Sequence, residues 1–86
     1  MKMKRKIFIV IDSNCGEPDV YTDINSAVEA MKEELEYHVD RWGYEKEELE
    51  RAYAEIDEDA KKNGDYNFGT YIGELSVNCY VNEIEI

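Results

Sequence analysis

The sequence has one histidine, two cysteines, one proline and no long hydrophobic run. His38, Cys15 and Cys79 show no zinc-ligand spacing, since such a site needs three or four nitrogen or sulfur ligands. We therefore expect no metal, no cofactor and reduced thiols, with a Cys15–Cys79 disulfide as the alternative in an oxidising compartment. The longest apolar run at the start, Ile7–Ile11, is too short for a signal peptide or a membrane span. We expect a cytoplasmic protein without membrane contact.

Catalytic motifs are also missing. The chain has no glycine-rich phosphate loop, and fragments such as Asp57-Glu58-Asp59 lack the full ligand pattern of a calcium loop. Cys15 precedes Gly16 in a predicted loop, but nothing in the sequence places His38 beside it as a base. Carboxylate pairs are so numerous that no single pair indicates acid–base chemistry. We expect no catalytic residues and no enzyme.

Negative charge is what the sequence has in excess. The 86 residues include 21 acids and ten bases, for a net charge of −11. Four of the bases fall within residues 1–6, which we expect to form a basic N-terminal arm of a single domain spanning 1–86. The remaining body is strongly acidic and should repel nucleic acid and anionic membranes. We therefore expect no direct binding to either.

The order of predicted elements indicates a small α+β domain. Residues 7–11 form a β-branched and aromatic run typical of a buried strand, and 19–22 can close a hairpin with it. Helices are predicted from about Asp23 to Gly43 and over 45–62, from apolar residues at helical spacing. Alternation returns at 67–72 and 75–86 and predicts two more strands. The result is β(β)ααββ, with two helices on one face of a mostly antiparallel sheet.

The acidic residues concentrate in the two predicted helices. Residues 29–59 contain 13 acids and four bases, and like charges four positions apart cost helical stability. One interpretation is a solvated surface that only keeps the protein soluble. The other is a face that binds a basic protein by ion pairing. The acids that we predict to contact such a partner are Glu33, Glu34, Glu36, Asp40, Glu45, Glu47, Glu48, Glu55, Glu58 and Asp59.

Aromatic residues near the predicted interhelix turn add to this surface. Trp42 and Tyr44 lie among carboxylates, and such rings can hold Lys or Arg side chains by cation–π contact. We predict both as partner-binding residues. The alternative for Trp42 is that it closes the core at the end of its helix.

The length, charge, acidic segment 29–59 and α+β pattern resemble small acidic proteins of phages and mobile elements, including anti-CRISPR proteins and other DNA-mimic inhibitors. The resemblance is one of type and shares no motif. It implies a stoichiometric inhibitor in a bacterial host cell, whose acidic face occupies the cationic groove of a nucleic-acid-binding effector. The alternative is a self-associating accessory domain, in which strand 75–86 pairs through an open edge. The chain is then a homodimer and not a monomer.

Overall fold

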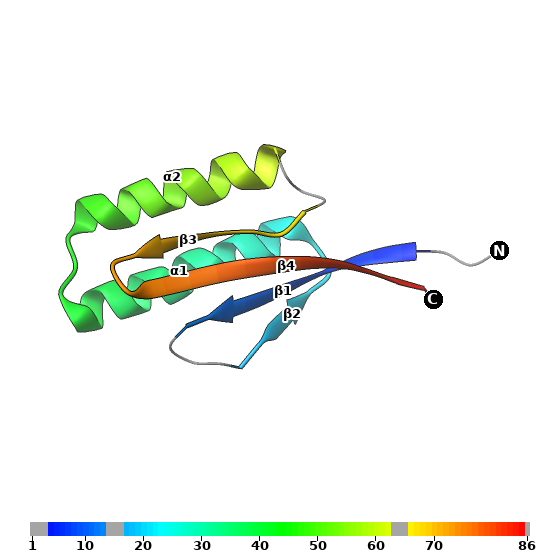
Figure 1. Ribbon diagram of the computed structural model, residues 1–86, viewed down its shortest axis with the longest axis horizontal. Coiled ribbons are helices and arrows are strands. Elements are labelled where there is room, and N and C mark those ends of the chain that lie inside the picture. The colour runs from blue at the N-terminus through cyan, green and yellow to red at the C-terminus, as the bar shows by residue number, and fades with distance from the viewer. Residues whose placement is uncertain (1–3, 14–16, 63–65, 86) are drawn as a thin grey trace.

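Two helices cover one face of a four-stranded antiparallel sheet in a computed structural model that describes residues 4–13, 17–62 and 66–85 (Figure 1). The elements follow in the order β1 (Lys4–Asp12), β2 (Asp19–Tyr21), α1 (Ile24–Trp42), α2 (Lys46–Lys62), β3 (Phe68–Ile72) and β4 (Leu75–Glu85). The α+β prediction with ββααββ order is confirmed. Cys15 lies outside the described residues.

The ends of α1 follow from local chemistry. Asp23 adopts an extended backbone, and its carboxylate accepts a hydrogen bond from the Ser26 N–H at 2.9 Å. This satisfies one of the N–H groups that the first helical turn leaves without a partner. At the other end Gly43 takes φ 73°, and its N–H donates to the Val39 carbonyl at 3.0 Å. The left-handed geometry suits glycine and ends the helix there.

The strands lie in the order β2-β1-β4-β3. Alternation along β1 turns Phe8, Val10 and Asp12 toward the helices and Ile7, Ile9 and Ile11 toward the open face of the sheet. The core lies between the sheet and the helices. Its fully buried side chains from the helices include Met31, Leu35 and Ile56, and those from β3 and β4 include Ile72, Leu75 and Val77.

The start of the chain differs from the basic N-terminal arm that the sequence predicted for residues 1–6. Residues 4–6 belong to β1 and do not form a separate arm, because Lys4 and Lys6 pair in register with Glu85 and Glu83 of β4. Residues 1–3 lie outside the described part. The starting half of β1 and the final half of β4 extend together beyond the helices (Figure 1).

Strand β4 is central and not an edge strand. Its residues 75–79 pair with β3 and its residues 77–85 pair with β1, so that 77–79 have a partner on both sides. Only from Tyr80 onward is its β3 side uncovered, and there the Val81 N–H donates to the Asn67 side-chain oxygen at 2.8 Å. The open edge expected along the whole of 75–86 is therefore restricted to its last residues.

Candidate functional site

Four carboxylates form a stripe along α1. Glu29, Glu33, Glu36 and Asp40 recur every three or four residues and are all exposed. Within the described ranges, none of the four has an ion pair with a Lys or Arg. We call this set the acidic stripe. It spans about 16 Å of helix, or one charge per ~5.5 Å, which is sparser than the charge per ~3.4 Å along one strand of B-DNA.

The acidic stripe borders a groove between α1 and α2. A pocket of about 270 Å³ is lined by Glu29, Lys32, Glu33, Glu36 and Tyr53. The Tyr53 hydroxyl donates to the Lys32 carbonyl at 3.0 Å. Burial raises the pKa of Tyr53, and the nearby negative charge and hydrogen bond of Glu36 raise it further. The groove thus combines the acids of the stripe with the Lys32 ammonium, which lies 5.5 Å from the centre of the Tyr53 ring.

The acids of α2 are arranged differently. Glu55 pairs with Arg51 at 2.9 Å and accepts a hydrogen bond from the Thr70 hydroxyl on β3. Asp57 pairs with Lys32 at 2.8 Å, across to α1. Glu58 pairs with Lys62 at 2.7 Å, and this contact lowers the pKa of Glu58. These carboxylates are held by the protein's own cations, so the helices do not present one continuous anionic strip.

The other predicted partner-binding residues are spread over several surfaces. Glu47 and Glu48 lie in the first turn of α2, where negative charge also favours the helix. Glu45 precedes that helix and is exposed, whereas Asp59 is half-buried. Glu34 is not part of the exposed acidic surface, because its side chain faces β1. Of the twelve predicted residues, the structure places Glu33, Glu36 and Asp40 together on the acidic stripe.

The two predicted aromatics have unequal exposure. Trp42 is 43% exposed, with its ring centre 6.0 Å from that of Tyr44. Tyr44 is half-buried and packs on the core, and its ring lies so close to Gly73 that an added Cβ there would be 2.6 Å from the Tyr44 hydroxyl oxygen. Trp42 can therefore contact a partner, while Tyr44 mainly supports the turn between β3 and β4.

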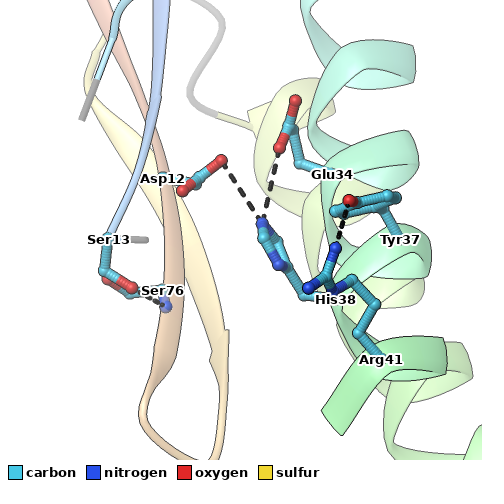
Figure 2. Close-up of polar contacts among 7 residues, drawn as sticks. All are labelled: Asp12, Ser13, Glu34, Tyr37, His38, Arg41 and Ser76. Atoms are coloured by element: carbon cyan, nitrogen blue, oxygen red, sulfur yellow. Dashed lines mark hydrogen bonds and ion pairs between the residues drawn. The ribbon is translucent and has the colours of Figure 1, made fainter. Parts of the chain in front are cut away.

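A second cluster, which sequence reasoning missed, lies between β1 and α1. The Asp12 carboxylate and the His38 imidazole are almost fully buried, at 5% and 1% exposure. The His38 Nε2 atom lies 3.7 Å from a carboxylate oxygen of Asp12 and 3.7 Å from one of Glu34. Figure 2 shows the three side chains pointing toward one another, Asp12 from the strand and the other two from the helix.

Local structure explains why these residues meet. Asp12 continues the helix-facing alternation of Phe8 and Val10 to the end of β1. His38 lies three positions after Leu35 on the buried face of α1, and Glu34 lies one turn before His38. The one available signal was that His38 and Asp12 both continue apolar periodicities. The sequence separation of 22 residues between Asp12 and Glu34 concealed the cluster.

The cluster opens into a small acidic pocket. This pocket has a volume of about 130 Å³ and is lined by Val10, Asp12, Glu17, Asp19 and Glu34. The pKa of Glu34 is raised from 4.5 to about 7, first by a hydrogen bond with Asp12, then by burial and the Asp12 charge. Glu34 therefore retains a proton in part of the molecules near neutral pH.

Comparisons with protein-family models, curated proteins and solved structures find no match to this chain. Among the described residues, no helix combines the length and apolar character needed to cross a membrane.

Proposed function

We propose that this protein is a non-enzymatic protein-binding module whose acidic stripe contacts a cationic surface of a partner. The observation that carries the proposal is that Glu29, Glu33, Glu36 and Asp40 are exposed and lack Lys or Arg ion-pair partners in the described part of the chain. Repulsion between such neighbours costs stability. A surface that retains this cost favours a role in attracting opposite charge.

The partner class that we propose is a nucleic-acid-binding protein, because Lys and Arg gather on the surfaces of such proteins. Binding there would compete with nucleic acid and act as inhibition of the anti-CRISPR or DNA-mimic type. The sparse charge along α1 supports contact with a few basic side chains and not replacement of a whole duplex. The groove between α1 and α2, about 270 Å³ in volume, gives room beside the stripe for the stems of those side chains.

The test compares three proteins of matched fold. One carries Glu→Gln or Asp→Asn at the four stripe positions. A control carries four Glu→Gln changes at Glu17, Glu50, Glu74 and Glu83, which gives the same net charge. Each is immobilised and exposed to a heparin-purified fraction of bacterial extract. Captured proteins are then assayed for displacement of labelled DNA by the free module.

The wild type and the control should displace DNA, and the stripe variant should not. Four exposed pairs worth ~0.5–1 kcal/mol each predict a loss of affinity of about 30-fold or more. Equal displacement by all three proteins would show that the stripe is not the binding surface. Failure of the wild type to displace DNA from any captured protein would contradict the proposed inhibition of nucleic-acid binding.

Self-association is the second candidate, favoured by the open face of the sheet. Ile9 lies in register between Val20 of β2 and Tyr80 of β4, and Val20 and Tyr80 are exposed. The outward residues of β4 from Ser76 to Ile84 are uncharged. A second copy could stack on this face as two packed sheets, with both helix layers and their acids outside. Charge on the helices would then not oppose the dimer directly.

Light scattering on size-exclusion fractions tests this candidate. We expect a dimer for the wild type and a monomer for Tyr80→Glu, because the charge would be buried between the sheets. Tyr66→Glu is the control, since Tyr66 is exposed and precedes β3. A wild-type protein that stays monomeric at high concentration would rule out the candidate.

A further inference from the structure

We propose that Asp12, Glu34 and His38 form a binding site for one divalent transition-metal ion, and that zinc fits these ligands best. The site lies between β1 and α1, whereas the acidic stripe borders the groove between α1 and α2. The inference is therefore independent of the proposed partner binding.

The distances are those of ligands around a shared cation. One ligand atom from each of the three side chains lies within 4.8 Å of the other two. Nε2 is 3.7 Å from each carboxylate oxygen, which is longer than a normal N–H···O hydrogen bond. Two ligand atoms at ~2.1 Å from a tetrahedral ion are ~3.4 Å apart. The two nitrogen–oxygen distances therefore need to shorten by only a few tenths of an ångström, and the two carboxylate oxygens already lie within 4.8 Å of each other.

The charges also favour a cation. Asp12 and His38 are more than nine-tenths buried, and the carboxylates of Asp12 and Glu34 line the same acidic pocket. A buried net charge is costly unless an opposite charge balances it. A divalent ion would supply that opposite charge. Ligand side chains must be deprotonated to bind such an ion, so metal and protons compete for the site.

The imidazole selects the type of ion. Carboxylates alone favour Mg²⁺, Ca²⁺ and Mn²⁺, but a histidine nitrogen favours Zn²⁺, Co²⁺ and similar ions. Tyr37 and Trp42 pack on the His38 ring at centroid distances of 5.2 and 5.7 Å, which holds the ring in the direction seen in Figure 2. A ring held in this way enters the site with less loss of side-chain freedom than a mobile one.

The pocket gives the ion access and space for water. Its volume of about 130 Å³ accommodates a few water molecules at ~30 Å³ each. Glu17 and Asp19 line the same pocket and would attract a cation toward the three ligands. Three protein ligands with water in the remaining position form an open site.

The experiment uses tag-free, EDTA-treated full-length protein titrated with Zn²⁺, Co²⁺ and Mg²⁺. Calorimetry gives stoichiometry and affinity, and long-range ¹H–¹⁵N NMR follows the imidazole nitrogens. His38 is the only histidine of the chain, so its signals need no assignment by mutation. We expect one Zn²⁺ per chain, weaker binding of Mg²⁺, and a large shift of the His38 Nε2 resonance on addition of Zn²⁺.

A pair of neighbouring variants provides the control. Glu34→Gln removes a proposed ligand, and Glu33→Gln makes the same change of charge on an exposed neighbour. Zinc affinity should fall at least tenfold in the first and stay within about twofold in the second. Absence of zinc binding at 100-fold molar excess, binding that leaves the His38 resonances unchanged, or equal losses in both variants would overturn the proposal. If Glu34→Gln does not fold, the proposal is tested by the wild type alone: its His38 Nε2 resonance must shift on addition of Zn²⁺.

Discussion

Glu33 and Glu34 are sequence neighbours with opposite surroundings. Glu33 belongs to the exposed stripe, whereas Glu34 turns toward Asp12 and His38. The 100° step between helix positions is enough to separate a surface charge from a partly buried one. The chemistry of this chain thus depends on which side of α1 a carboxylate occupies, and not only on how many carboxylates there are.

The stability of the metal-free protein should depend on pH because the pKa of Glu34 differs between the folded and unfolded chain. Its pKa is about 7 in the folded chain and near 4.5 when unfolded, so only the folded form keeps the proton between these values. The cost of ionising Glu34 is absent below about pH 4.5, grows as pH rises, and is complete above about pH 7. The melting temperature of Glu34→Gln should therefore rise relative to wild type between pH 5 and pH 8 in EDTA-containing buffer. A Glu34→Gln difference that stays flat over this range would contradict the assignment.

Cys79 should behave as an inert thiol. Its side chain is a free, fully buried thiol, and burial raises its pKa to about 11. At pH 8 this lowers the thiolate fraction roughly 100-fold relative to a thiol with the usual pKa of 9. Iodoacetamide should thus modify Cys79 at least 100-fold more slowly in native protein than in denaturant. Peptide mapping by mass spectrometry distinguishes it from Cys15, and equal native and denatured rates at Cys79 would contradict its burial.

At the level of single residues, the sequence predicted the exposed acids better than the buried ones. Glu33, Glu36 and Asp40 are exposed on one helix face, as helical spacing indicates. The predicted strand 7–11 ends one residue before Asp12, and His38 was assigned to no site, because each is an isolated polar residue on an apolar periodicity. Their proximity depends on how β1 packs against α1, and this tertiary contact has no counterpart in local sequence.

Among the elements, the helices were predicted within about one residue at each end. Asp23 and Gly43 are chemical signals that act on adjacent backbone groups, so they can be interpreted without the tertiary structure. The strand order β2-β1-β4-β3 could not be predicted in this way. Alternation in 75–85 identifies a strand but does not say whether β1, β3 or both will pair with it.

Substitutions of Gly43 test how much the end of α1 depends on backbone conformation. Its φ of 73° lies in the left-handed region, and an added Cβ would meet no heavy atom within 4 Å. Gly43→Ala should therefore lower the free energy of unfolding by about 1 kcal/mol through backbone strain alone. Gly43→Asn should cost less, because asparagine tolerates this region better. Urea denaturation measures both, and a cost for alanine no greater than that for asparagine would indicate a different helix end.

Charge is unequally distributed over the whole molecule. The acidic stripe and the paired acids of α2 lie in the helix layer, while the outward residues of β4 from Ser76 to Ile84 carry no charge. One face is therefore suited to oppositely charged partners and the other to apolar contact. The two candidate functions use different faces, so the same molecule can be tested for each without interference.

The uncompensated stripe should make the fold sensitive to salt. Its members are neighbours at three or four positions, and each such pair costs ~0.3 kcal/mol at low ionic strength. Raising NaCl from 20 mM to 500 mM should raise the melting temperature of the wild type, because salt screens this repulsion. The variant with all four stripe residues neutralised should gain about 1 kcal/mol at low salt and show a smaller salt response. Neutralising Glu55 and Glu58 should have the opposite effect at low salt, because each is paired with a base. A stripe variant that is less stable than wild type at 20 mM NaCl would mean that these carboxylates stabilise the fold, and their proposed role in attracting a partner would lose its physical basis.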